Sequence, residues 1–104
     1  MIKMSVIYVE YITNLFSSTL ILRSDTKKEL EKTILDIPYD EIIFDFSGVK
    51  SMNTEFAREY ISIKHRSKKI VNEVNVPLNL QPLMDKAMES ISGIRPLQVF
   101  VDIG

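Results

Sequence analysis

The sequence predicts a single α/β domain over residues 1–104, in which helices pack on a mixed or mainly parallel sheet of about four or five strands. Three observations lead to this prediction. Short runs rich in β-branched and aromatic residues alternate with segments whose apolar residues recur at helical spacing. The chain has only 3 glycines, too few for an all-β chain with many tight turns. Its 104 residues are close to the commonest size of one domain.

The first third of the chain contains strand signals followed by a helix signal. Residues 5–13 are rich in Val, Ile and Tyr, which predicts one or two opening strands, and a turn-like stretch then leads to the apolar residues 20–22. A helix is expected next, because Thr26 and Glu29 have the spacing of a capping box. We expect this helix to end before Pro38.

The middle of the chain contains a strand, a polar turn and a second helix. Residues 41–46 form an almost continuous apolar run interrupted by Asp45, which is typical of a strand covered on both faces. We therefore expect this strand at the centre of the sheet. After the turn, a helix is expected to start on Asn53 and Thr54 and to continue to about Ser67, because apolar residues recur at helical spacing.

The last third of the chain repeats the alternation. Residues 70–76 are predicted to form a strand, and Asn79 as a cap with Pro82 in the first turn predicts a helix that reaches about residue 90. Residues 97–101 are expected to form a final short strand.

Composition excludes several classes of function. The chain has no cysteine, which excludes disulfides, thiolate catalysis and Cys-based zinc sites, and the single His65 cannot form a histidine metal cage. A net charge of −1 argues against a broad nucleic-acid surface. No apolar run approaches the roughly 18 residues that span a bilayer, and the opening segment does not have the pattern of a signal peptide. We expect a cytoplasmic protein without cofactor or metal.

Asp45 has two interpretations because it is a carboxylate in an apolar strand. As a catalytic group it would have a pKa raised by desolvation. The favoured interpretation is structural, with Asp45 accepting hydrogen bonds from the backbone of Ser47 and Gly48 in an Asx-type turn. No other carboxylate has a sequence spacing that would guarantee an acid/base pair with Asp45. Glu55 and Glu59 are four residues apart on one helix face, which we expect to be exposed. We therefore do not expect an enzyme.

The corner between the central strand and the following helix resembles a known family. The segment Asp45-Phe-Ser-Gly-Val49, followed by Met52-Asn-Thr54 and Phe56-Ala-Arg-Glu59, is similar to the STAS-like domains of unknown function, which are related to anti-sigma-factor antagonists. The resemblance covers roughly residues 20–90 and implies a STAS-like fold. It also implies a regulatory module that docks onto a kinase-like or ATPase-like partner protein.

The resemblance also implies a site. In the antagonists, the matching positions hold an Asp-Ser pair whose Ser is phosphorylated, and Asn53 and Thr54 occupy those positions here. Thr54 is therefore the candidate phosphorylation switch, and Ser51 is a second, weaker candidate hydroxyl. The alternative for Asn53 and Thr54 is that they only cap the helix. The expected partner-binding residues are Ser47, Gly48, Asn53, Thr54, Glu55, Arg58 and Glu59.

Two other functions stay open at this point. The same corner could bind a small ligand or nucleotide, although no Gly-rich phosphate loop is present. Alternatively, residues 6–12 could pair as an exposed edge strand and make the chain a homodimer or scaffold. The basic residues 64–69 are interpreted as a solvated helix end. We expect a protein partner rather than a nucleic acid or a membrane.

Overall fold

A three-stranded parallel sheet lies at the centre of the protein in the computed structural model, which describes residues 6–92. Its strands are β1 (Ile7–Tyr11), β3 (Glu41–Asp45) and β5 (Ile70–Val74), in the spatial order β1-β3-β5. A second parallel pair joins β2 (Thr19–Leu20) to β4 (Ser51–Met52). The predicted α/β class with a mainly parallel sheet is therefore confirmed, and so is the central position of the strand that begins at Glu41.

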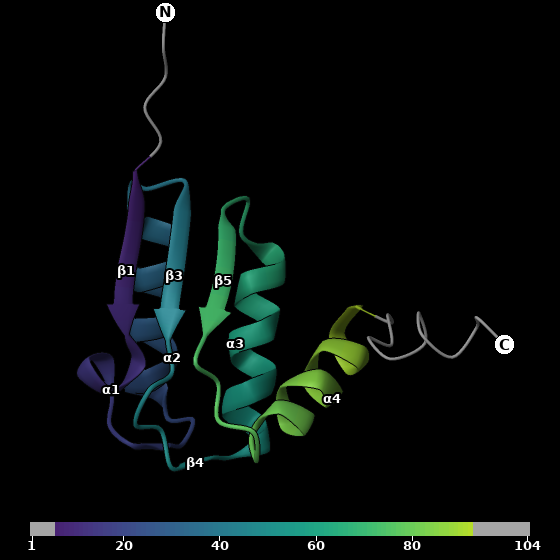
Figure 1. The fold of residues 1–104 in the computed structure, drawn as a ribbon. Coiled ribbons are helices and arrows are strands. Elements are labelled where there is room, and N and C mark those ends of the chain that lie inside the picture. The colour runs from purple at the N-terminus through teal and green to yellow at the C-terminus, as the bar shows by residue number, and fades with distance from the viewer. Residues whose placement is uncertain (1–5, 93–104) are drawn as a thin grey trace, which may run out of the picture.

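The helices cover one face of the sheet. They are α1 (Ile12–Leu15), α2 (Ser24–Glu31), which continues into the π-helical turn η1 (Lys32–Asp36), α3 (Thr54–Arg66) and α4 (Gln81–Ser92). In Figure 1, α2 and α3 lie side by side behind the sheet, and α4 packs against α3. No described helix lies on the opposite face of the sheet (Figure 1).

The core forms between the sheet and these helices and contains a cluster of aromatic rings. Tyr60 of α3 is fully buried and meets Phe44 and Phe46 edge to face, with ring centroids 5.7 and 5.8 Å apart. Its hydroxyl donates a hydrogen bond to Glu73 Oε2 at 2.7 Å, and Lys64 Nζ lies 2.8 Å from the same oxygen. Burial, followed by the charge and hydrogen bond of Glu73, raises the pKa of Tyr60 well above its usual value. Tyr60 is therefore a neutral donor that ties α3 to β5.

The covering of β3 differs from the prediction. Ile42 and Phe44 are fully buried, but the alternate residues Glu41, Ile43 and Asp45 are half-buried on the other side. Among residues 6–92, helices therefore cover β3 on one face only, and not on both faces as predicted. The sequence is misleading here because Ile43, an apolar residue on the face without helices, makes an alternating strand look like a continuous apolar run.

The start of the first helix also differs from the prediction. α2 begins at Ser24, and the predicted capping box is wrong. The Thr26 hydroxyl donates instead to the carbonyl of Ile21 at 3.3 Å, and the Glu29 carboxylate accepts from the hydroxyl of Thr33 at 3.4 Å. The helix therefore starts without a side-chain cap, and the Thr26 side chain ties it to the segment after β2. The helical path ends with η1, before the proline, as predicted.

Two further boundaries are corrected. The opening strand ends at Tyr11, and Ile12 starts a short helical turn that places its own side chain fully in the core. Asn79 is not the cap of α4, because the carbonyl of Leu80 accepts the first helical N–H, from Met84, at 3.2 Å. The predicted strand at residues 97–101 lies outside the described residues. Within residues 6–92, no helix is long and apolar enough to cross a membrane.

Candidate docking corner after β3

Asp45 organises the loop that leaves the carboxyl end of β3. Its Oδ1 accepts hydrogen bonds from the Ser47 N–H at 2.8 Å and from the Ser47 hydroxyl at 2.6 Å. The Nδ2 of Asn75, which follows β5, lies 3.2 Å from both carboxylate oxygens. The predicted turn is therefore confirmed for Ser47, whereas the predicted hydrogen bond from the Gly48 N–H is not among those found in residues 6–92. The carboxylate also joins the ends of two neighbouring strands.

The hydrogen bonds around Asp45 favour its charged form. The Ser47 hydroxyl and then the Ser47 N–H lower the pKa of the Asp45 carboxyl below its ordinary value; desolvation opposes them in part, and the hydrogen bond from Asn75 adds a smaller lowering effect. A general base needs a pKa near the working pH, and the pKa of the Asp45 carboxyl is shifted away from that range. Asp45 is a structural anion that holds the loop.

Asn75 is a site residue that the sequence reasoning missed. Its φ is 57°, in the left-handed region that Asn tolerates better than most residues. The strand was predicted to run to residue 76, but β5 ends at Val74, so Asn75 lies in the turn that follows it. Asn is a common turn residue and could have indicated the earlier end of the strand. What the sequence could not provide is the pairing of Asn75 with Asp45, which follows only from the parallel register of β3 and β5.

Gly48 allows the loop to turn back toward the second strand pair. Its φ is 83°, a backbone conformation that side chains with a Cβ rarely adopt, and a Cβ there would lie 3.6 Å from Thr13 Cγ2. The following Lys50 N–H donates to the carbonyl of Ser18 at 2.7 Å, which starts the pairing of β4 with β2. The loop is thus fixed at both ends before the chain reaches α3.

Asn53 caps α3, as its sequence position predicted. Its Oδ1 accepts the Phe56 N–H at 2.8 Å, and its own N–H donates to the carbonyl of Leu20 at 2.9 Å. Asn53 therefore both starts the helix and attaches it to β2. Because its Oδ1 is bonded to the helix backbone, Asn53 has a structural role in positioning the corner.

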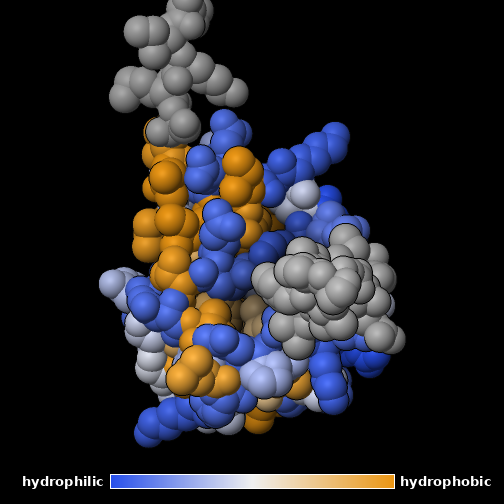
Figure 2. Space-filling model, turned by 45° about the vertical axis from the view of Figure 1, so that its right-hand side comes forward, coloured by the Kyte–Doolittle hydropathy of each residue, from blue (hydrophilic) through white to orange (hydrophobic). Residues whose placement is uncertain are grey.

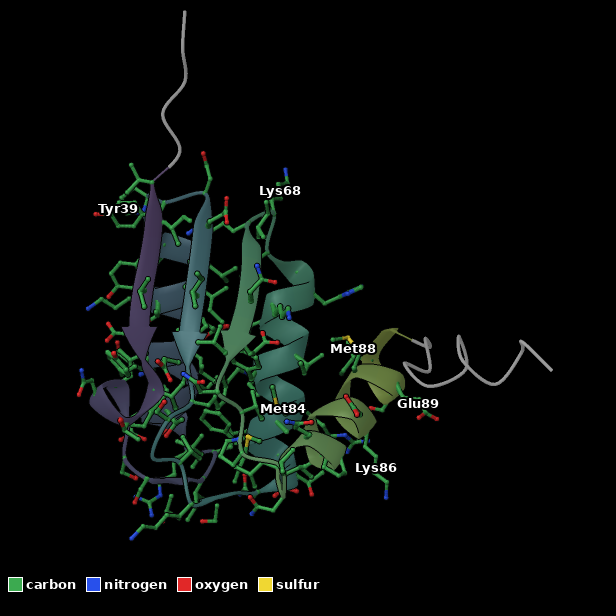
Figure 3. The ribbon with its side chains drawn as sticks, viewed as in Figure 1. Tyr39, Lys68, Met84, Lys86, Met88 and Glu89 are labelled. Carbon is green, nitrogen blue, oxygen red and sulfur yellow. The ribbon has the colours of Figure 1, made fainter. Side chains whose placement is uncertain are left out.

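Thr54 is exposed, in contrast to Asn53. Its side chain makes no hydrogen bond among the described residues, so capping does not use the Thr54 hydroxyl. Thr54 and Arg58 line a groove of about 580 Å³ between α3 and α4. On the α4 side, the groove is lined by Leu83, Lys86, Ala87, Glu89 and Ser90. Lys86 and Glu89 point outward from α4, while Met84 lies on the side toward α3, as Figure 3 shows.

The structure separates the predicted partner-binding residues into two groups. Ser47 and Gly48 lie exposed at the end of β3, and β4 then crosses the lower edge of the molecule to the start of α3 (Figure 1). Thr54, Glu55 and Arg58 are exposed on the first two turns of α3; Asn53 and Glu59 are half-buried. Ser51 is exposed, but it lies in β4, where its N–H donates to Ser18. The groove residue Lys86 was not identified from the sequence.

The roles of Asn53 and Thr54 can be separated by substitution. Asn53→Ala is expected to lower the free energy of unfolding by about 1 kcal/mol, because the Phe56 N–H loses its acceptor. Thr54→Ala should change it by less than about 0.5 kcal/mol, because this side chain is exposed. Urea unfolding of both variants checks the prediction. An equal loss in both would show that Thr54 is also a structural cap.

The alternative of a ligand site has two candidate hollows, the groove lined by Thr54 and Arg58 and a second cavity nearby. A cavity of about 550 Å³ is lined by the segment before β2 and the start of α2, and it includes Arg23, Asp25 and Phe56 but none of residues 47–55. Among residues 6–92, no group of three or more His, Asp or Glu side chains could hold a metal ion. The part of the corner on α3 thus borders the groove, whereas residues 47–53 line neither of these two hollows.

Comparison with known proteins adds no relative. No protein-family model matches the chain, and no curated protein and no solved structure is significantly similar to it.

Proposed function

We propose that this protein is a non-enzymatic regulatory module that docks a kinase-like or ATPase-like partner protein through the first turns of α3, with phosphorylation of Thr54 as its switch. The observation that carries the proposal is the exposed Thr54 hydroxyl on a firmly capped helix start. The fold does not use this hydroxyl, so a change in its charge alters the surface and leaves the core as it is.

The charges near Thr54 support a switch of this kind. A phosphate at a helix start meets the unpaired N–H groups of the first turn and the positive end of the helix dipole. Arg58 is four residues further along α3, which is the spacing at which helical side chains interact, and Lys86 lines the same groove. Glu55 beside Thr54 and Glu89 across the groove are the opposing charges. After phosphorylation, Arg58 and Lys86 would pair with the phosphate and would no longer be available to contact the partner protein.

The rigidity of the corner also supports docking. Asp45 holds the loop to Asn75, and Asn53 holds the helix start to Leu20, so the exposed residues of the loop and of the first turns of α3 are presented on a fixed backbone. A preformed surface avoids the entropy cost of ordering a loop on binding.

The experiment captures proteins from the native cell lysate on immobilised wild-type, Thr54→Glu and Thr54→Gln proteins. We expect a partner that is retained by wild type and by Thr54→Gln but is lost from Thr54→Glu, because only Glu adds a negative charge at this position. Mass spectrometry identifies what each surface retains. Equal retention on all three surfaces would contradict a charge switch at Thr54, and retention on none would contradict docking through this corner.

A further inference from the structure

One face of the sheet, on which no helix of residues 6–92 lies, is rich in exposed apolar side chains. We call it the open face and define it by the outward side chains of the three strands. These are Ile7, Val9 and Tyr11 of β1, Glu41, Ile43 and Asp45 of β3, and Ile70, Asn72 and Val74 of β5. Six of the nine are apolar or aromatic. Figure 2 shows hydrophobic side chains gathered over these strands, with hydrophilic ones between them.

The apolar residues of the open face are accessible. The exposed fractions are 55% for Val9, 56% for Ile70, 48% for Ile7 and 47% for Tyr11. Parallel sheets are normally covered on both faces. A contiguous patch of exposed apolar side chains on a monomer usually marks an interaction site. The open face is therefore expected to bind an occupant that supplies the missing layer.

Charge narrows the choice of occupant. The two charged side chains of the open face are Glu41 and Asp45, both on the central strand, and no Lys, Arg or His is among its nine residues. A second copy packed by its own open face would bring these carboxylates together without any compensating cation. The complementary surface is apolar with positive charges.

The dimensions of the open face further limit which occupant can bind to it. Three strands with five residues each present a surface about 10 Å wide and about 13 Å long between outermost Cα positions. One helix with its side chains is about 10–12 Å across and rises about 15 Å in ten residues. We propose that the open face binds one amphipathic helix of a partner protein, whose apolar stripe packs on Val9, Ile43 and Ile70 and whose Lys or Arg residues meet Glu41 and Asp45. This surface is distinct from the corner at Thr54.

The test uses a synthetic peptide of about 14 residues with Leu at positions i, i+3, i+4 and i+7 and Lys elsewhere. Binding to the full chain is measured with methyl-labelled isoleucine. We expect the methyl signals of Ile7, Ile43 and Ile70 to shift, while those of Ile34, Ile61 and Ile63 in the core stay in place. A peptide of the same composition with scrambled order, and one with Glu in place of Lys, should bind much more weakly.

A pair of variants separates the open face from general charge effects. Val9→Lys should weaken binding of the Leu/Lys peptide at least about tenfold, because it places a cation in an apolar contact. Leu78→Lys makes the same chemical change at a side chain that is 82% exposed and lies outside the open face, so it should leave binding unchanged.

Three results would overturn the proposal. The first is equal weakening by both variants. The second is a wild-type dimer that Val9→Lys converts to a monomer, since a second copy would then be the occupant. The third is peptide binding only after removal of residues 93–104, because that segment of the chain would then cover the face. None of these results affects the Thr54 experiment.

Discussion

Tyr60→Ala is expected to lower the free energy of unfolding by about 3–5 kcal/mol, a large part of the total for a domain of this size. Tyr60 is fully buried between Phe44 and Phe46, and truncation removes both edge-to-face contacts and opens a cavity. It also removes the hydroxyl donor of Glu73. Urea unfolding followed by circular dichroism measures the effect.

Tyr60→Phe is the matched control, because it removes only the hydroxyl. Glu73 then keeps its ion pair with Lys64, so a loss of about 1–2 kcal/mol is expected. Equal losses in the two variants would mean that the hydrogen bond, and not the packing of the ring, dominates the role of Tyr60.

Arg58→Glu is expected to weaken capture of the partner at least about tenfold, because it places a negative charge where the docking surface is proposed to be positive. Arg58 is exposed on the second turn of α3 and makes no ion pair among residues 6–92. Stability should therefore stay close to that of wild type. Retention of the captured partner on immobilised variants measures the effect.

Lys27→Glu is the control for this reversal. It makes the same change in net charge at an exposed residue of α2, which does not line the groove between α3 and α4. Capture by Lys27→Glu should equal capture by wild type. Equal weakening by both reversals would indicate a general effect of net charge and would contradict a specific contact at Arg58.

The fold class could be predicted from the sequence because periodicity is a local signal. The run from Ile42 to Phe46 and the helical spacing of Phe56, Tyr60 and Ile63 each depend on residues close in the chain. The cap at Asn53 was predicted for the same reason, since its partner is three residues away.

The errors came from features that depend on tertiary contacts. The spacing of Thr26 and Glu29 suggested a cap, but Thr26 bonds to Ile21 across the turn instead. Ile43 suggested a doubly covered strand, although no described helix lies on its side of the sheet. The local sequence pattern indicates whether a segment is a helix or a strand, but it does not reveal which segments pack on each of its faces.

The candidate site was predicted only in part. Asp45 with Ser47, and Asn53 with α3, follow from short-range turn and cap chemistry. The contributions of Asn75 and Lys86 come from elements that are more than twenty residues away in sequence and meet the corner only in the folded chain.

The most direct test of the central claim is an amide NMR footprint of the captured partner on the isotope-labelled chain. We expect signal changes at Thr54, Glu55 and Arg58 that disappear in the Thr54→Glu variant. A footprint confined to β1 and β5, with α3 unchanged, would contradict docking through the corner and would place the partner on the open face instead.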